Sequence, residues 1–111
     1  MKKSLESFGD EDKIKLLERG ILKDPKDMNI KFSLAILYHA KKEYEKAEKL
    51  YKEIIAVKPH SSKALFYLGA SLKKQKKYAE ALSYFEEYIK IKTNDAKVKE
   101  LIDSLKAKLP K

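Results

Sequence analysis

Residues 44–59, which read YEKAEKLYKEIIAVKP, and residues 78–93, which read YAEALSYFEEYIKIKT, decide the fold of this chain. In the first stretch the apolar side chains recur at i, i+3, i+6, i+7, i+10 and i+11 from Tyr44, which places them on one stripe of a helix. Nearly the same spacing recurs from Tyr78. Pro59 disfavours the α conformation of the residue before it and so ends the first helix. The two stretches therefore predict two copies of one amphipathic helix.

The sequence before each stretch is repeated as well. Residues 28–61 align with residues 62–95 with eight identities in 34 positions, and Pro25 stands 34 residues before Pro59. The identical pairs are Phe32/Phe66, Leu34/Leu68, Lys42/Lys76, Tyr44/Tyr78, Ala47/Ala81, Glu53/Glu87, Ile55/Ile89 and Lys58/Lys92. Because most of these pairs are apolar and fall at helical spacing, each unit is predicted to be one helical hairpin. We expect its helices over 28–41 and 44–57 in the first unit and over 62–75 and 78–91 in the second.

Two further helices are expected outside the repeated units. Residues 11–23 carry an apolar stripe, and Asp10 is expected to cap the helix that they form. Residues 95–108 carry another stripe, and their helix is expected to cover the apolar face of the last unit. For two helices the sequence offers neighbouring caps, Ser61 or Ser62 for the helix at 62 and Asn94 or Asp95 for the helix at 95.

The composition excludes several classes of protein. The 111 residues are expected to form one domain, and the absence of cysteine excludes disulfides, thiolate zinc sites and cysteine nucleophiles. His39 and His60 are the two histidines, and neither stands at a metal-binding spacing from carboxylates. The three glycines are scattered, so they form no phosphate-binding loop. We therefore expect no enzyme activity, no metal and no cofactor.

The repeated unit resembles the tetratricopeptide repeat (TPR), a helical hairpin of 34 residues. The residues that carry the resemblance are Leu34-Ala35 and Leu68-Gly69 in the first helix, Tyr44 and Tyr78 at the turn, and Ala47, Ala81, Tyr51 and Phe85 in the second helix. The small residues among them are expected where helices cross. The units depart from the family pattern at Lys31, Leu65, Ile54, Tyr88 and Thr93. The resemblance implies an all-α, right-handed solenoid of about six antiparallel helices in a single domain over 1–111. Its parts would be a leading helix at 11–23, repeat one at 28–61, repeat two at 62–95 and a capping helix at 96–109.

The resemblance also implies a concave groove, lined by the first helix of each unit, in which the family binds extended peptides or helices. The implied groove positions are Asn29, Phe32, Ser33, Ile36, His39 and Ala40 in the first unit, Lys63, Phe66, Tyr67, Ala70, Lys73 and Lys74 in the second, and Lys97, Glu100 and Ser104 in the capping helix. Groove positions face solvent in the free protein, so apolar residues there predict a hydrophobic recognition patch flanked by Lys63, Lys73 and Lys97. The alternative is that a terminal helix, or the N-terminal segment with Leu5 and Phe8, covers this patch.

Some members of the family hold the C-terminal carboxylate of chaperones with a clamp of Lys and Asn side chains. In the usual register the clamp requires Lys and Asn where this chain has Phe32 and Ile36, and Asn where it has Tyr67. Lys97 fits the clamp, but Leu101 replaces its second cation. Binding of chaperone tails is therefore not expected.

The net charge of +9 falls in residues 31–111, because residues 1–30 carry seven basic and seven acidic side chains. Specific reading of DNA bases relies on Arg, and Arg19 is the one arginine of the sequence, so sequence-specific DNA binding is not expected. Lysines gather at the turn within each unit, namely Lys41, Lys42, Lys73, Lys74, Lys76 and Lys77. Stacking of the repeats would place both turns on one side as a basic edge. That edge either docks an acidic partner, a lipid or an RNA backbone, or is a solvated turn.

The leading hypothesis is a protein–protein interaction module that binds an acidic and apolar peptide or helix in the groove, as a scaffold or adaptor. One alternative is association of the basic edge with RNA or another polyanion, and another is self-assembly into a homo-oligomer through the groove. Met1-Lys2-Lys3 is not followed by the apolar segment of a signal peptide, and no apolar run is long enough to span a membrane. We therefore expect a cytoplasmic protein.

Overall fold

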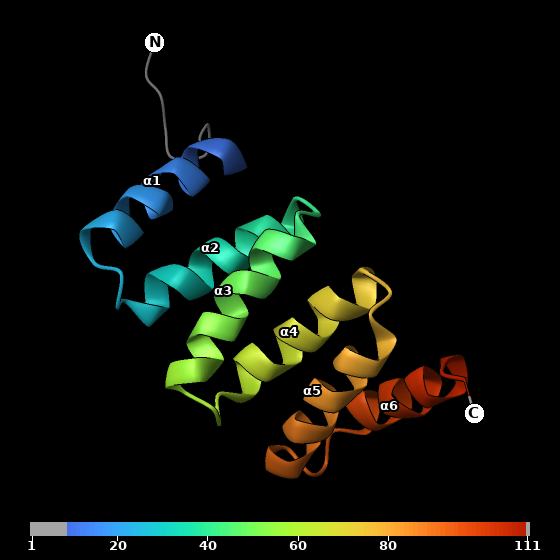
Figure 1. The fold of residues 1–111 in the computed structure, drawn as a ribbon. Helices are drawn as coiled ribbons and strands as arrows, with labels where there is room; N and C mark the ends of the chain where they lie inside the picture. The colour runs from blue at the N-terminus through green and yellow to red at the C-terminus, as the bar shows by residue number, and fades with distance from the viewer. Residues whose placement is uncertain (1–8, 111) are drawn as a thin grey trace.

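The computed structural model describes residues 9–110, and this part of the chain folds into six α-helices (Figure 1). They are α1 (Asp10–Lys23), α2 (Met28–Ala40), α3 (Tyr44–Val57), α4 (Ser62–Lys74), α5 (Tyr78–Ile91) and α6 (Ala96–Lys108). All six begin and end within one residue of the predicted helices, and no β-strand occurs between residues 9 and 110. The expectations for Met1-Lys2-Lys3, Leu5 and Phe8 concern residues outside this described range.

The six helices form an elongated array rather than a compact bundle. The extensive helix–helix contacts join sequential neighbours, from α1 against α2 through to α5 against α6. The array measures 58 × 28 × 24 Å, and its radius of gyration is 15.8 Å. A compact domain of this length would have a radius of gyration of about 13 Å. The predicted all-α solenoid is thus confirmed, and each helix depends on its immediate neighbours for burial.

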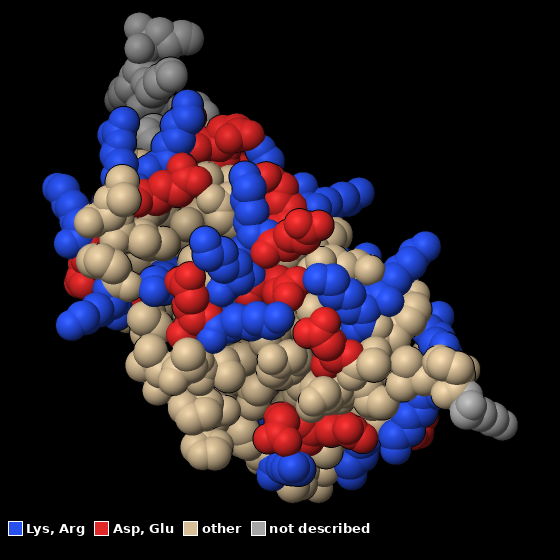
Figure 2. Space-filling view, in the orientation of Figure 1, with Lys and Arg blue, Asp and Glu red and all other residues tan. Residues whose placement is uncertain are grey.

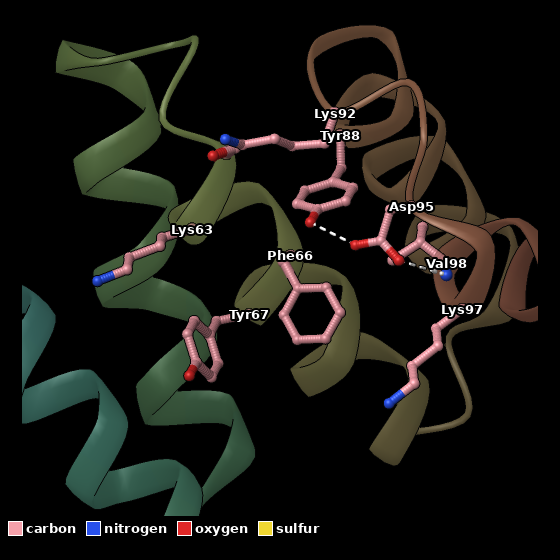
Figure 3. Close-up of a pocket in the computed structure, with 9 residues that line it drawn as sticks. Lys63, Phe66, Tyr67, Tyr88, Lys92, Asp95, Lys97 and Val98 are labelled. Carbon is pink, nitrogen blue, oxygen red and sulfur yellow. Dashed lines mark hydrogen bonds between the residues drawn. The ribbon is translucent and has the colours of Figure 1, made fainter.

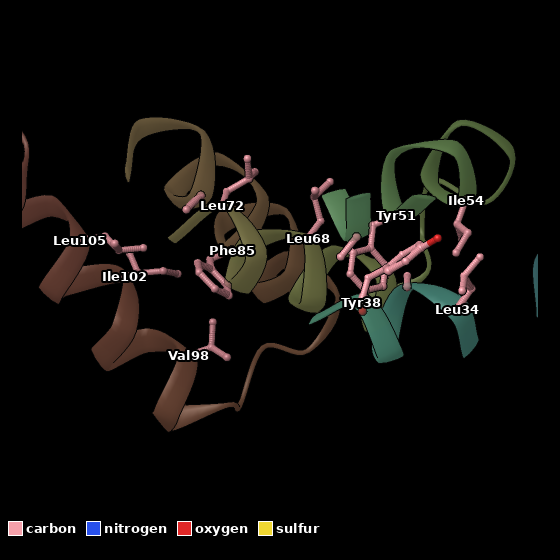
Figure 4. Packing of buried hydrophobic residues seen from close by; sticks show 14 of the residues in the cluster. Leu34, Tyr38, Tyr51, Ile54, Leu68, Leu72, Phe85, Val98, Ile102 and Leu105 are labelled. Carbon is pink, nitrogen blue, oxygen red and sulfur yellow. The ribbon is translucent and has the colours of Figure 1, made fainter. Parts of the chain in front are cut away.

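One hydrophobic core runs along the solenoid, and Figure 4 shows it from Leu34 in α2 to Leu105 in α6. The small residues predicted at the helix crossings are all buried, namely Ala35, Ala47, Gly69 and Ala81. A Cβ atom added to Gly69 would lie 2.9 Å from ring carbons of Phe85. The backbone of α4 therefore approaches this ring so closely that a side chain at position 69 would have to displace it.

Side chains cap the N-termini of α4 and α6. Ser61 accepts a hydrogen bond from the first turn of α4 at 3.3 Å, and Asp95 accepts one from the first turn of α6 at 3.1 Å. Each bond confirms one of the two alternatives offered by the sequence. The predicted cap of α1 is wrong, because Gly9 occupies the cap position and makes no side-chain bond. Asp10 is instead the first helical residue, where its negative charge still favours the helix N-terminus.

The turn within each repeat contains a residue in the left-handed conformation. Lys42 has φ 66° and Lys76 has φ 64°, and these two positions are 34 residues apart. In the first turn the N–H of Glu43 donates to the carbonyl of Tyr38 at 2.8 Å, and the second turn makes the equivalent bond at 2.9 Å. Both turns therefore end the preceding helix with the same C-terminal motif. They lie on one side of the solenoid, as the basic edge requires (Figure 1).

Polar side chains join the first repeat to the second. Glu48 of α3 is only 9% exposed, and its carboxylate accepts hydrogen bonds from Gln75 at 2.9 Å and from Lys77 at 3.3 Å. Lys52 pairs with the other carboxylate oxygen at 2.8 Å. Burial acts to raise the pKa of Glu48, but the bonds from Lys52, Gln75 and Lys77 outweigh it and hold this pKa below its usual value. The charged carboxylate therefore fixes the turn of repeat two against α3.

Two kinds of feature are missing from residues 9–110. No helix there combines the length and the apolar character needed to cross a bilayer. No group of three His, Asp or Glu side chains there is arranged to hold a metal ion.

Candidate partner-binding groove

The predicted groove positions of α2 and α4 carry a continuous row of aromatic rings. Phe32 makes an edge-to-face contact with Tyr67 at 5.7 Å between ring centroids, and Tyr67 makes another with Phe66 at 5.5 Å. Tyr51 of α3 stacks on Tyr67 at 5.9 Å, and Phe85 of α5 contacts Phe66 at 5.8 Å. Because Tyr51 and Phe85 are fully buried, the row is anchored in the core of both repeats.

The rings of this row are less exposed than their groove positions led us to expect. Phe32, Phe66 and Tyr67 are half-buried because they pack against the core, whereas Ile36 is 38% exposed. The groove therefore does not present a patch of fully exposed aromatic rings. It presents partly buried rings, which line hollows on the surface.

We number the hollows by the repeat whose first helix lines them. Hollow 2 has a volume of about 450 Å³ and lies where α4 meets the end of α5 and the start of α6 (Figure 3). It is lined by Ser62, Lys63, Phe66, Tyr67, Tyr88, Lys92, Asp95, Lys97 and Val98. The rings of Phe66 and Tyr88 lie together at its centre, 5.7 Å apart between centroids. Lys63 and Lys97 lie on either side of Phe66 (Figure 3). The hollow thus combines an aromatic floor with cations at its rim.

Hollow 1 has a volume of about 290 Å³ and lies where α2 meets the end of α3 and the start of α4. It is lined by Met28, Asn29, Phe32, Ser33, Ile54, Lys58, Ser61 and Lys63. Each of these residues stands 34 positions before a lining residue of hollow 2. The two hollows are therefore the same place in two successive repeats. Lys63 lines both hollows. In hollow 1 it occupies the position that Lys97 has in hollow 2, and in hollow 2 it occupies the position that Asn29 has in hollow 1.

Positive charge dominates both hollows. The exposed cations are Lys58, Lys63, Lys92 and Lys97. Between residues 9 and 110 none of them forms an ion pair. The acidic residue of the lining is Asp95, whose carboxylate accepts hydrogen bonds from the Tyr88 hydroxyl at 2.7 Å and from the N–H of Val98 at 3.1 Å. These bonds lower the pKa of Asp95, so its charge persists at neutral pH and offsets one of the cations.

Sequence reasoning found part of this lining and missed the rest. It named Asn29, Phe32, Ser33, Lys63, Phe66, Tyr67 and Lys97. It missed the residues of the second helices and of the junctions between repeats, and three residues near the starts of α2, α4 and α6. These are Ile54, Lys58, Ser61, Tyr88, Lys92 and Asp95, and Met28, Ser62 and Val98. The identity of Lys58 with Lys92 in the alignment was the available signal. The family resemblance does not point to these residues, because the groove positions that it implies lie in the first helices and the capping helix.

Ile36 lies in a different hollow from the rest of the predicted groove. With Leu16, Leu17 and Leu37 it lines an apolar depression of about 450 Å³ between α1 and α2, where Lys13 is the one charged residue of the lining. Leu16 is 52% exposed.

His39 connects the two repeats instead of facing a hollow. Its Nδ1 atom lies 3.0 Å from the hydroxyl oxygen of Ser71, and its ring packs edge-to-face on Tyr44 at 5.1 Å. Burial, with a smaller contribution from the charge of Lys74, lowers the pKa of His39. Lys73 and Ala70 are half-buried, and Ala40, Glu100 and Ser104 are exposed outside both hollows.

The basic edge is partly neutralised within the molecule. Lys41 pairs with Glu11 of α1, and Lys77 pairs with the buried Glu48. Lys42, Lys74 and Lys76 are exposed. Figure 2 shows Lys and Arg interspersed with Asp and Glu over α1 to α3 on the face that it displays, without a single large positive area there.

Sequential stacking of helical hairpins with a 34-residue repeat defines the chain as a helical-repeat protein. The sequence pattern of the tetratricopeptide repeat family matches residues 27–94, so the chain belongs to that family. No curated protein sequence matches the chain.

Solved structures of TPR domains share this fold. The first TPR domain of Spaghetti (RPAP3), bound to the HSP90 peptide SRMEEVD, superposes with a TM-score of 0.81 at 19% identity, over 88% of this chain and 78% of that one. The second TPR domain of human RPAP3, in complex with the HSP70 peptide SGPTIEEVD, gives 0.77 at 25% identity, over 87% and 81%. MamA AMB-1 gives 0.84 at 22% identity over 88% of this chain, which spans 54% of the MamA chain. At these identities the likeness concerns the fold.

Proposed function

We propose that this protein is a non-enzymatic interaction module that binds an acidic peptide or helix with apolar side chains in the concave groove, and so acts as a scaffold or adaptor. The observation that carries the proposal is the pair of equivalent hollows, in which aromatic floors are rimmed by lysines that form no ion pair with residues 9–110. An apolar floor favours burial of an apolar side chain, and the lysines attract carboxylates. Two of the similar TPR domains hold acidic peptides, which agrees with this use of the fold.

The ligand is expected to differ from the chaperone tails bound by those domains. Phe32, Ile36 and Tyr67 occupy three positions where the carboxylate clamp of the family requires Lys or Asn, and Leu101 replaces a cation. A fluorescent SGPTIEEVD peptide should therefore bind no more tightly than the same peptide with its last residue amidated. Loss of affinity on amidation would contradict this expectation.

The central experiment is affinity capture from the native host with identification by mass spectrometry. The baits are the wild type and a Phe32→Leu/Phe66→Leu variant, which keeps apolar bulk in the core while removing one phenylalanine ring from each hollow. Tyr84→Leu is the matched control, because Tyr84 is a half-buried aromatic of α5 that lines neither hollow. Partners held by the wild type and the control should be lost from the double variant. If all three baits capture the same partners, the groove is not the binding site.

The alternatives differ in what they predict for the same protein. Association of the basic edge with RNA requires binding at low salt that weakens steeply as salt rises. Self-assembly requires a molar mass by light scattering that increases with protein concentration. The pairing of Lys41 and Lys77 inside the molecule reduces the charge that the edge offers to a polyanion, so we rank the groove first.

A further inference from the structure

We propose that hollow 1 and hollow 2 are two subsites of a single site, which bind two bulky apolar side chains of one extended acidic peptide and share Lys63 between them. This inference rests on the proposed function and adds to it the composition and spacing of the ligand. The peptide would place an aromatic side chain in hollow 2 and an aliphatic side chain in hollow 1, with a carboxylate next to each of these two anchors.

The equivalence of the two linings is the first argument. Because the lining residues are related by the 34-residue repeat, the two hollows face the ligand in the same orientation and succeed one another along the solenoid. A peptide that runs along the groove therefore meets the same arrangement twice. Repetition of a site along a solenoid is how helical-repeat proteins build extended binding surfaces.

The position of Lys63 is the second argument. It lines both hollows, whereas Lys58 lines hollow 1 alone and Lys92 lines hollow 2 alone. Its side chain is exposed and forms no ion pair with residues 9–110, so its ammonium group is available between the two anchors. A carboxylate between the two apolar anchors of a peptide would therefore meet Lys63.

The floors of the hollows indicate which side chain each would accept. In hollow 2 the rings of Phe66 and Tyr88 stand 5.7 Å apart, and a third ring can pack on their edges and faces. In hollow 1 the residue equivalent to Tyr88 is Ile54, and the volume falls from about 450 to about 290 Å³. The larger, aromatic hollow suits a Phe side chain, and the smaller one suits a Leu or Val side chain.

The fold also sets the separation of the anchors. Adjacent helices pack about 8–10 Å apart, and equivalent points of successive repeats are one to two such spacings apart because α3 lies between α2 and α4 in the stack. An extended peptide advances about 3.3 Å per residue, so roughly three to six residues cover this distance. Peptides with shorter spacers would reach one hollow at a time.

The experiment uses the full chain and a set of fluorescent synthetic peptides. Each peptide carries one Phe-Glu unit and one Leu-Glu unit, in either order, joined by a Gly/Ser spacer that grows from one to about eight residues. Peptides with a single unit are included, as are peptides in which Glu is replaced by Gln. Dissociation constants are measured by fluorescence anisotropy for the wild type and for Lys58→Ala, Lys63→Ala, Lys92→Ala and the control Lys99→Ala. Lys99 is exposed on α6 outside both hollows, and its substitution changes the net charge equally.

Affinity should peak at one range of spacer lengths, where the two-unit peptide binds at least about tenfold more tightly than either single-unit peptide. For that peptide Lys63→Ala should weaken binding by roughly fivefold to tenfold and Lys58→Ala or Lys92→Ala by roughly threefold, while Lys99→Ala changes it by less than about twofold. For a peptide with the Phe-Glu unit alone, Lys92→Ala should weaken binding and Lys58→Ala should not.

Several outcomes would overturn the inference. One is affinity that is independent of the spacer, and another is equal losses from Lys63→Ala and Lys99→Ala, since both would indicate attraction to net charge alone. Failure of every peptide to bind would also overturn it. None of these outcomes touches the proposed function, which fails separately if the Phe32→Leu/Phe66→Leu variant keeps its natural partners.

Discussion

Hollow 1 and hollow 2 occupy the same place in two repeats, yet they differ in size and in chemistry. Where hollow 2 has Tyr88 and Tyr67, hollow 1 has Ile54 and Ser33. Hollow 2 also has an additional lysine at its rim, because it has Lys63 at the position where hollow 1 has Asn29.

The difference separates what the fold supplies from what the side chains supply. The small residues at the helix crossings, the left-handed turn residues and the aromatic row recur in both repeats, and they set the position of each hollow. The residues that line the hollows vary between repeats without changing the backbone around them. Ligand choice can therefore vary along a TPR array while the framework stays constant.

The largest expected effect tests whether the aromatic packing of hollow 2 is stronger than that of hollow 1. Phe66 contacts the rings of Tyr67, Phe85 and Tyr88, whereas Phe32 contacts those of Tyr51 and Tyr67. Phe66→Ala should lower the free energy of unfolding by about 3 kcal/mol and Phe32→Ala by about 2 kcal/mol, because both rings are only half-buried. Urea denaturation followed by circular dichroism measures both. A larger loss from Phe32→Ala would reverse the comparison.

The next effect concerns the helix crossing of each repeat, where Ala35 is equivalent to Gly69. Gly69→Ala should lower the free energy of unfolding by about 1–2 kcal/mol, because the new methyl group meets the Phe85 ring and this outweighs the roughly 1 kcal/mol gained in helix propensity. The reverse change, Ala35→Gly, should cost about 1 kcal/mol. If Gly69→Ala raised the midpoint of urea unfolding, the two crossings would be interchangeable.

A smaller effect of opposite sign is expected at the turns, where the two repeats are alike. Lys42→Gly and Lys76→Gly should each raise the free energy of unfolding by roughly 0.5–1 kcal/mol, because Gly adopts positive φ without the steric cost of a Cβ atom. Lys49→Gly, in the middle of α3, serves as the control and should cost about 1 kcal/mol. Unequal gains from the two turn variants would show that the turns differ in strain.

The smallest effect is a dependence of stability on pH that belongs to the first repeat alone, since His39 is equivalent to Lys73 in the second. Burial and the charge of Lys74 lower the pKa of His39, so the unfolded chain binds a proton at this residue more readily than the folded one. The contribution of His39 to the free energy of unfolding should therefore be fully present above about pH 6.5, and it should decline as the pH falls below that value. Unfolding curves between about pH 8 and pH 5 measure this slope.

His39→Gln should flatten the slope, and His60→Gln, in the exposed loop after Pro59, should leave it unchanged. The residues that face His39 are Ser71, Tyr44, Tyr67 and Lys74. A slope that persists in the His39→Gln variant would assign the pH dependence to the carboxylates instead.

The framework of this molecule was predictable because its causes are local and repeated. The 34-residue spacing of Ala47 and Ala81 gave the helix crossings, and Pro59 gave the end of α3, which stops at Val57. The cap of α1 was predicted wrongly because both Gly9 and Asp10 are compatible with a helix start, and the choice between them depends on the backbone at Gly9.

The site was less predictable because it depends on contacts between repeats. Lys92 and Lys63 line the same hollow only because α5 folds back along α4. Their spacing along the chain does not predict that they lie close together. The burial of Glu48 likewise requires Gln75 and Lys77 from the next repeat. The half-buried state of Phe32 and Tyr67 follows from the stacking of Tyr51, which a helix-by-helix interpretation of the sequence does not include.

The linear arrangement of the helices makes hollow 2, but not hollow 1, depend on α6. The extensive contacts of α6 are with α5, and α6 supplies Lys97 and Val98 to hollow 2. Because each helix of a one-dimensional array is held mainly by its neighbours, local opening of α6 would dismantle hollow 2 and leave hollow 1 intact. A ligand held in hollow 2 would in turn slow amide hydrogen exchange in α6. Occupancy of the larger hollow and the order of the C-terminal helix are therefore one equilibrium.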